Sequence, residues 1–307
     1  MVKEKILSLL KDSKNPVSGQ IISKNLKISR VAVWKHIKLL KKVGYDISAS
    51  SSGYLLKENN DLLLPWEFPE HKNIHYFKKV ASTMNLAKEL AIKGCPDKTI
   101  VIAESQKSGR GRIKRIWDSR PGGLYFTIIF RPDIPLNYAF LYNFASSVTI
   151  VETINEYLNI ETTIKWPNDI LIEGKKIAGI LLDLSGELDN IQYLNLGIGI
   201  NINNQISSKL PEATSLSIIK GKHLYRKEIL KIFLKKLNKY TSDIFNSGIL
   251  EKYRSYSSTL YNFVTVNQHG GKIIKGQAIN IDDNGNLIIK DAKNKNISIS
   301  SGDCINE

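Results

Sequence analysis

The sequence predicts an α+β protein in three parts, and three observations support that division. Residues 1–62 have a basic, helical pattern, residues 74–201 alternate strand-like with helix-like segments, and short strand-like runs follow from Phe263 onwards. With 307 residues, of which 42% are hydrophobic and 24% charged, the chain is long enough for two or three globular domains. We therefore expect domains at residues 1–62, 63–258 and 259–307.

The first domain is predicted to be a winged helix-turn-helix. Apolar residues share one helical face up to Leu10, Ser18 can cap a second helix, and Ser29 can cap a third helix that ends at Gly44. Alternating residues at 45–48 and 54–56, with a Ser-Ser-Ser-Gly turn between them, indicate a β-hairpin. Three helices followed by a hairpin predict the winged form of the helix-turn-helix.

The charge of this domain favours DNA as its partner. Residues 1–60 contain twelve Lys and Arg against four Asp and Glu, a surplus of +8 in a chain whose net charge is +15. The third helix has basic side chains opposite its apolar stripe, and its first turns are where such domains read bases. A three-helix protein-interaction module and a lysine-rich composition without a partner remain alternatives. The expected DNA-binding residues are Gly19, Ser29, Arg30, Trp34, Lys35 and Lys38.

The most informative run is Gly-Arg-Gly-Arg-Ile-Lys-Arg-Ile-Trp at residues 109–117, the glycine-arginine loop. Glycines let a backbone approach a ligand, arginines offer forked donors to phosphate or carboxylate, and an indole supplies a flat apolar wall. The loop lies between two strands that are expected to be buried, 99–103 and 124–130, in a connection too long to be a simple turn. We expect a lid over an anionic ligand, with few residues to anchor it beforehand; a solvated basic loop or nucleic-acid patch is the alternative.

Polar residues at two other positions could contribute to a ligand site. Ser82 and Thr83 open a predicted helix after a strand at 75–77, where their hydroxyls can cap the helix or bind a small polar ligand. The segment Lys-Trp-Pro-Asn-Asp at 165–169 leads into a strand, a turn and another strand at 175–181. Taken alone, the lysines of these segments could simply be surface residues.

Gly197 and Gly199 alternate with isoleucine in a strand-like run. Because glycine weakens a strand interior, two of them suggest close approach by a ligand or by another backbone. Relief of crowded packing is the structural alternative.

The third domain is predicted to be a small β-barrel, preceded by an amphipathic helix around 222–247. Turns are expected at 270–271 and 283–285. No catalytic residue is apparent here, so docking of a substrate and a purely structural cap are both open. The expected strands are 263–266, 273–274, 277–279, 287–289 and 297–299.

In order along the chain, these motifs closely resemble those of biotin protein ligases. With the preceding winged helix, the chain is similar to the bifunctional bacterial members, which are both ligase and biotin operon repressor. The resemblance covers essentially the whole chain and implies a class II synthetase-like mixed α/β catalytic domain and an SH3-like C-terminal barrel. Ala81 departs from it, since many relatives carry aspartate there. The motifs are Ser82-Thr83, Gln106, the glycine-arginine loop, Lys165 to Asp169, Lys176 to Gly179 and Gly197 to Asn201.

The resemblance implies a two-step reaction. Biotin and ATP, with Mg²⁺, form biotinyl-5′-adenylate and pyrophosphate, and a lysine of an acceptor protein then takes the biotinyl group. Arg110, Arg112, Arg115 and Lys176 would bind and neutralise phosphate or carboxylate oxygens, and Asp169 would help place metal or substrate. No set of metal-ligating protein residues is expected. The residues implied in binding biotin or ATP are Ser82, Thr83, Met84, Gln106, Gly109, Arg110, Gly111, Arg112, Trp117, Lys165, Lys176, Gly197, Gly199 and Asn201.

The implied partners are a biotin carboxyl carrier protein of acetyl-CoA carboxylase, operator DNA and, with adenylate bound, a second copy of the chain. Its methionines are Met1 and Met84, so a Met-Lys-Met acceptor sequence is absent and the chain is expected to be ligase, not carrier. We expect a cytoplasmic protein, because Cys95 and Cys304 fit no zinc or disulfide pattern. We expect no membrane span, because no run approaches about eighteen uninterrupted apolar residues. A ligase without repression, a biotin sensor without turnover and a lipoate ligase are the alternatives; the glycine-arginine loop argues against the last.

Overall fold

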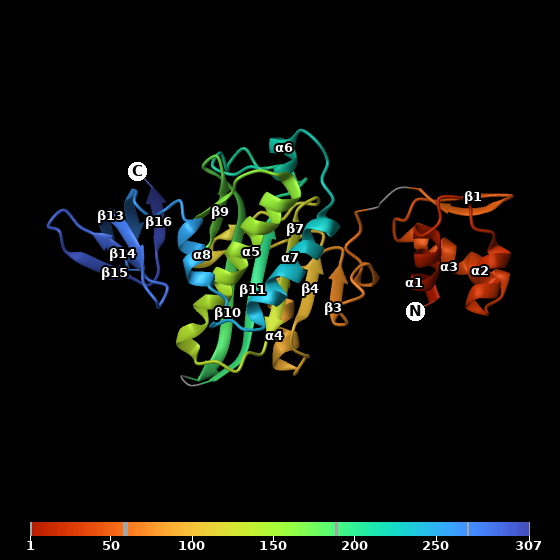
Figure 1. The fold of residues 1–307 in the computed structure, drawn as a ribbon, viewed down its shortest axis with the longest axis horizontal. Helices are drawn as coiled ribbons and strands as arrows, with labels where there is room; N and C mark the ends of the chain where they lie inside the picture. The colour runs from red at the N-terminus through yellow and green to blue at the C-terminus, as the bar shows by residue number, and fades with distance from the viewer. Residues whose placement is uncertain (1, 58–60, 188–189, 269, 307) are drawn as a thin grey trace. The chain divides into compact units, whose positions relative to one another are not determined.

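The computed structural model describes residues 2–57, 61–187, 190–268 and 270–306. By its internal contacts the chain forms two compact units, residues 1–67 and 68–307 (Figure 1). The second unit contains both the large central sheet and the C-terminal sheet. Across the described residues, no helix has the length and apolar character needed to cross a bilayer.

The first unit is the winged helix-turn-helix that the sequence predicts. The hydroxyl of Ser18 accepts from the backbone N–H of Ile21 at 3.2 Å, and that of Ser29 from Ala32 at 3.1 Å, so both serines cap helices as expected. The wing turn is tighter than predicted, because Ser50 pairs with Gly53 and only two residues lie between the strands. The elements are α1 (Val2–Lys11), α2 (Gly19–Leu26), α3 (Arg30–Lys42), β1 (Ile47–Ser50), β2 (Gly53–Leu56) and the 3₁₀ turn η1 (Pro65–Glu67).

A buried carboxylate holds the end of this unit. The Glu67 side chain is fully buried, accepts from Lys11 Nζ at 2.7 Å, and also accepts a hydrogen bond from the Tyr45 hydroxyl. Trp66 Nε1 donates to the same hydroxyl at 2.8 Å. Burial, together with Glu67, raises the pKa of Tyr45. These contacts explain why the compact unit continues to residue 67.

The second unit is built on a seven-stranded mixed sheet in the order β3-β4-β7-β11-β10-β9-β8. Only the β3–β4 pair of this sheet is parallel, and β10 and β11 form its longest pair. The mixed α/β prediction for the central domain is therefore confirmed. The strands are β3 (Ile74–Phe77), β4 (Thr99–Ala103), β7 (Leu124–Phe130), β8 (Thr163–Lys165), β9 (Asp169–Ile172), β10 (Lys175–Glu187) and β11 (Asn190–Ile200).

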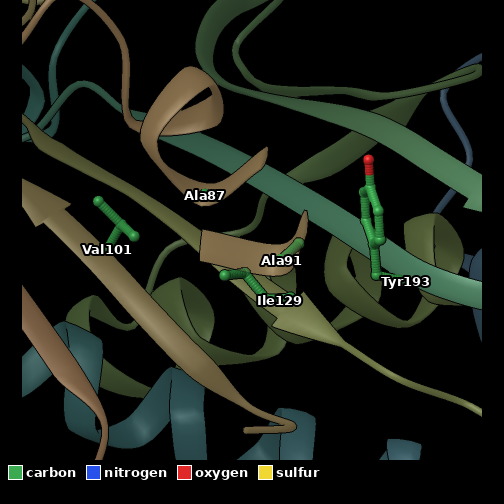
Figure 2. Close-up of a cluster of buried hydrophobic side chains, with 5 residues drawn as sticks. All are labelled: Ala87, Ala91, Val101, Ile129 and Tyr193. Carbon is green, nitrogen blue, oxygen red and sulfur yellow. The ribbon is translucent and has the colours of Figure 1, made fainter. Parts of the chain in front are cut away.

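Helices cover both faces of this sheet. On one face α4 (Thr83–Ile92) places Ala87 and Ala91 against Val101, Ile129 and Tyr193 (Figure 2). On the other face lie α5 (Phe140–Leu158) and α7 (Arg226–Thr241), where the ring of Phe233 meets that of Phe126 at 5.4 Å between centroids. The sequence analysis places an amphipathic helix at 222–247, and the observed α7 is shorter. Outside the glycine-arginine loop, the other helical elements of this unit are α6 (Leu216–Lys220), α8 (Ile249–Ser255) and the 3₁₀ turn η3 (Leu136–Tyr138).

The C-terminal part is a five-stranded antiparallel sheet in the order β15-β14-β13-β12-β16. Two predicted strands, 273–274 and 277–279, are in fact one long strand with a bulge between Ala278 and Asn280. Trp166 Nε1 donates to the carbonyl of Gly285 at 3.2 Å and ties this sheet to the central one. Its strands are β12 (Phe263–Asn267), β13 (Ile273–Ile281), β14 (Leu287–Lys290), β15 (Asn296–Ile299) and β16 (Asp303–Asn306).

Candidate active site

A cavity in the second unit brings together most of the predicted site residues. It is bounded by the start of α4, the glycine-arginine loop, strands β9 to β11 and the segment 204–213. Ser82, Gly109 and Lys165 are not among its lining residues. The predicted residues that do line it are Thr83, Met84, Gln106, Arg110, Gly111, Arg112, Arg115, Trp117, Asp169, Lys176, Gly197, Gly199 and Asn201.

The glycine-arginine loop is an ordered hairpin. Strand β5 (Gly109–Arg110) pairs with β6 (Ile116–Trp117), and the 3₁₀ turn η2 (Arg112–Lys114) connects them. Ile113 has φ 51°, an unusual value for a β-branched residue, so the tip is held in an unfavourable backbone conformation. Hairpin pairing and turn therefore give the loop a defined shape.

Its arginines anchor the loop, so the expectation that it carries few anchoring residues is wrong. Arg110 pairs with Asp183 at 3.0 Å on β10. Arg112 donates to Asn168 Oδ1 at 2.7 Å and to the carbonyl of Gly302 at 3.2 Å. Arg115 makes two hydrogen bonds to Asp303, at 2.6 and 3.3 Å. The same side chains that suggest anion binding fix the loop to the sheet and to β16.

A pair of facing glycines makes a flat bed for Trp117. Gly179 of β10 and Gly199 of β11 are cross-strand partners. A Cβ at Gly179 would lie 2.8 Å from Cζ3 of the indole, and one at Gly199 would lie 2.5 Å from its Nε1. Gly197 likewise faces the Met84 sulfur, 2.5 Å from a built Cβ. The close approach expected at the glycine strand is therefore made by side chains of the loop and of α4.

Gln106 takes over the capping of α4. Its Oε1 accepts from the Thr83 backbone N–H at 2.8 Å and from the Thr83 hydroxyl at 3.2 Å, while its Nε2 donates to Ser119 at 2.8 Å. Ser82, at the N-cap position, makes no capping hydrogen bond. Its buried hydroxyl has no hydrogen-bond partner in the described parts of the chain. The sequence left two roles open for the Ser82 hydroxyl, capping the helix and binding a polar ligand, and in the structure it does not cap α4.

Lys176 lies between a carboxylate and the indole. Its Nζ is 2.7 Å from Asp169 Oδ1 and 5.2 Å from the centroid of the Trp117 ring. The lysine thus contacts both the start of β9 and the glycine-arginine loop. Asp169 and Lys176, two of the four predicted catalytic residues, form a direct ion pair.

The charges of the cavity are balanced. Four cationic residues, Arg110, Arg112, Arg115 and Lys176, line it together with four acidic residues, Asp118, Asp169, Glu212 and Asp303. This arrangement can accept an anionic ligand by exchange of partners, since each cation already has an oxygen partner.

Two pKa shifts follow from these contacts. Burial lowers the pKa of Arg112, against the opposing effect of Asp169 and Asp303. Burial alone would raise the pKa of Asp303, but the hydrogen bond and charge of Arg115 hold it below its usual value. Lys165 lowers it further, which places this lysine near β16 although it does not line the cavity.

Sequence reasoning missed several residues of the site. Asn168 lies within the Lys-Trp-Pro-Asn-Asp segment but was not predicted to be a site residue, and nothing in the local sequence marks Asp183 or Asp303. The segment 204–213 was also missed; within it, Asn204 Nδ2 donates to Asn201 Oδ1 at 3.0 Å. That bond engages the predicted ligand residue Asn201 in a turn.

A second candidate site is a groove in the first unit. It is lined by the start of α2, the first turns of α3 and the wing, including Gly19, Arg30 and Trp34. Trp34 is 52% exposed, with Lys38 Nζ 5.2 Å from its ring centroid. Three predicted DNA-binding residues thus line one groove, while Ser29, Lys35 and Lys38 are exposed on or next to the same helix.

Metal-binding and disulfide chemistry find little support within the described residues. No group of three or more His, Cys, Asp or Glu side chains there could hold a metal ion. Cys95 and Cys304 are both free thiols.

Three protein-family models match successive parts of the chain. Residues 76–201 match the biotin/lipoate A/B protein ligase family, residues 2–55 match an HTH domain, and residues 264–305 match the biotin protein ligase C terminal domain. The fold class predicted from the sequence is therefore confirmed.

Individual relatives match most of the chain. The bifunctional ligase/repressor BirA of Bacillus subtilis is 36% identical over 290 residues, 89% of each chain. The protein of the same name from Escherichia coli is 27% identical over 290 residues, 89% of this chain and 88% of its own. A solved structure, the biotin protein ligase of Aquifex aeolicus in complex with biotin and ATP, is 29% identical with a TM-score of 0.65, covering 77% of this chain and all of that one.

Proposed function

The chain belongs to the family of bifunctional biotin ligase/repressors, and on that premise we propose that it biotinylates a carrier protein and represses biotin genes in response to biotin. The observation that carries the proposal is 36% identity to such a protein over 89% of the chain, with a winged helix preceding a cavity rich in paired cations. Biotin and ATP are its small-molecule substrates, in keeping with the solved relative that binds both.

In the proposed first step, a biotin carboxylate oxygen attacks the α-phosphorus of ATP. The P–O bond to pyrophosphate breaks, and biotinyl-5′-AMP remains as a mixed anhydride. Arg112, Arg115 and Lys176 would neutralise the phosphate and carboxylate oxygens in this step. The indole of Trp117 would cover the apolar side of biotin, and the Ser82 and Thr83 hydroxyls, with Gln106, would pair with its ureido group.

In the second step, a lysine amine of the acceptor attacks the carbonyl of the anhydride, an amide bond forms and AMP leaves. We infer that the acceptor is a biotin carboxyl carrier protein and that repression acts on operator DNA through the first unit. Biotinyl-5′-AMP would serve as corepressor and favour a homodimer. A cytoplasmic location is consistent with the two free cysteines.

Mg²⁺ fits this site only as a companion of the nucleotide. Asp169 is a suitable oxygen ligand in the cavity, but it is paired with Lys176, and the described residues supply no cluster of three metal ligands. We propose that ATP phosphates hold the ion and that Asp169 contributes one oxygen. When bound, the ion would neutralise charge on the phosphates.

Incubation of the chain with ATP, Mg²⁺, radiolabelled biotin and a biotin carrier domain tests the ligase activity. We expect labelled adenylate, release of pyrophosphate and then a labelled carrier. Absence of both labelled adenylate and labelled carrier would refute the proposed ligase activity.

Operator binding is tested separately with the variant Arg30→Ala/Lys35→Ala. We expect its affinity for operator DNA to fall at least ~10-fold while adenylate formation stays unchanged, because both residues lie in the first unit, outside the cavity. Lys24→Ala, on α2 outside the groove, is the matched control. Operator binding of the double variant equal to that of the control would refute the assignment of this surface.

A further inference from the structure

Asn195 is a fully buried amide, and neither its Oδ1 nor its Nδ2 has a hydrogen-bond partner among the described residues. Buried polar side chains in folded proteins are nearly always paired, because an unpaired one loses its hydration without compensation. Its cross-strand neighbour Asp183 instead accepts from Arg110. An amide in this condition indicates a partner that comes from outside the chain.

Asn195 lies on the face of the sheet that carries the cavity. It sits in β11 between Ile129 of β7 and Asp183 of β10. Because side chains alternate along a strand, it shares a face with Tyr193 and Gly197. Tyr193 and Ile129 pack against α4 on that face (Figure 2), and the cavity begins at Gly197. Asn195 therefore lies two residues beyond the cavity lining, on the side of α4.

Met84 covers Gly197, the cavity-lining residue two positions from Asn195 along β11. Its sulfur lies against Gly197, and its side chain both lines the cavity and is buried. Methionine has several rotatable bonds and a soft thioether, so the Met84 side chain can move off Gly197 when a ligand enters. The amide of Asn195 would then become the end wall of the pocket.

The position of Asn195 matches the ring end of biotin. In the proposed reaction the carboxylate of biotin must face Lys176 and the loop arginines, so its rings point toward α4 and Thr83. A cyclic urea offers one carbonyl between two N–H groups, and an asparagine amide offers a donor and an acceptor side by side. A thioether sulfur, by contrast, is only a weak acceptor.

We propose that Asn195 hydrogen-bonds the ureido ring of biotin and is a specificity-determining residue of the pocket. The inference rests on the proposed function, because biotin supplies the ligand group. This contact, from β11, would add to those proposed for Ser82, Thr83 and Gln106 at the start of α4.

Titration calorimetry on the full chain tests the proposal with Asn195→Leu and Asn195→Val. Both should raise the Kd for biotin at least ~10-fold, since a donor and an acceptor are lost. Without ligand, the Tm of each variant should equal or exceed that of the wild type, because an unpaired buried group is removed. Thr153→Val, which removes a buried, unpaired hydroxyl from α5 on the other face, is the matched control and should leave the Kd unchanged.

A Kd within ~2-fold of the wild type in a folded Asn195 variant would overturn the inference, with an internal water as the amide's partner instead. Desthiobiotin, which keeps the ureido ring and lacks the sulfur, should lose affinity by the same factor as biotin. If only biotin lost affinity, the ureido assignment would be wrong. If the wild type bound no biotin at all, the proposed function would fail first, so the two failures are distinguishable.

Discussion

The substitution Gly199→Ala tests the bed of glycines under Trp117. The added methyl carbon would lie 2.5 Å from the indole Nε1 and 2.6 Å from its Cε2. Carbon atoms in contact prefer separations of about 3.5–4.0 Å. Since the indole is rigid and β11 is a central strand, the ring must rise from the sheet by about 1 Å to relieve the contact.

We expect this displacement to reduce the rate of adenylation substantially. Trp117 belongs to the same hairpin as Arg110 and Arg112, so a shift of the indole also shifts the guanidinium groups. A misplacement of about 1 Å can cost ~10²-fold in rate. We therefore predict a ~100-fold fall in kcat/KM for biotin, or about 2.7 kcal/mol, measured by pyrophosphate release.

A second substitution separates a clash from a general loss of structure. Phenylalanine lacks the Nε1 edge of the indole, so Gly199→Ala/Trp117→Phe should recover ~10-fold over Gly199→Ala alone. Gly19→Ala is the control, because its methyl group would make only an ordinary contact, 3.5 Å from the Tyr54 ring. Wild-type kcat/KM in Gly199→Ala, or no recovery in the double variant, would refute the reasoning.

Three further predictions concern the ion pairs of the site. Lys176→Met keeps the aliphatic stem and removes the charge, so the rate of pyrophosphate release should fall ~10²–10³-fold. The Kd for biotin, measured by calorimetry, should change less than ~5-fold. An equal loss of affinity for biotin would argue for a role in binding only. Asp303→Asn should speed amide hydrogen exchange at residues 110–116, because Arg115 loses its charged partner; exchange equal to that of the wild type would contradict the anchoring role. The pKa of Asp303 is held below its usual value, so the stabilisation of the loop by its carboxylate is fully present above the ordinary carboxylate range and is lost as pH falls through the lowered value. Amide exchange at 110–116, corrected for intrinsic rates, should therefore rise only below about pH 4. A rise near neutral pH would contradict this.

The helices that could be predicted from the sequence are those with a row of apolar residues along one face. Helix α3 alternates buried and exposed residues, and the serine caps stand at the expected starts of α2 and α3, Ser18 and Ser29. Helix α5 was missed, because most of its residues are buried and it offers no amphipathic period. Strand β16 was missed too, since Asp303 to Asn306 is short and has no apolar alternation.

The residues of the site were predictable where one short segment carries the chemistry. The glycine-arginine loop and the segment 165–169 can be recognised in the sequence by their unusual composition. Their anchors do not, because Asp183 is 73 residues from Arg110 and Asp303 is 188 residues from Arg115. An acidic residue far along the chain looks like any surface carboxylate until the fold places it beside its partner.

The exposure of each carboxylate indicates how readily its cation can change partners. Asp303 and Asp183 are 35% and 30% exposed, so water can solvate them when a substrate oxygen replaces them on Arg115 and Arg110. Asp169 is somewhat less exposed, at 22%, and Glu67, in the first unit, is fully buried, so loss of Lys176 or Lys11 would leave a less well solvated charge, most severely at Glu67. The loop arginines are therefore the cations best placed to bind a ligand by exchange, and the Lys176–Asp169 pair the one best placed to stay intact and orient it. In this arrangement the acidic partners hold the guanidinium groups in position before the ligand arrives, which lowers the entropy lost when it binds.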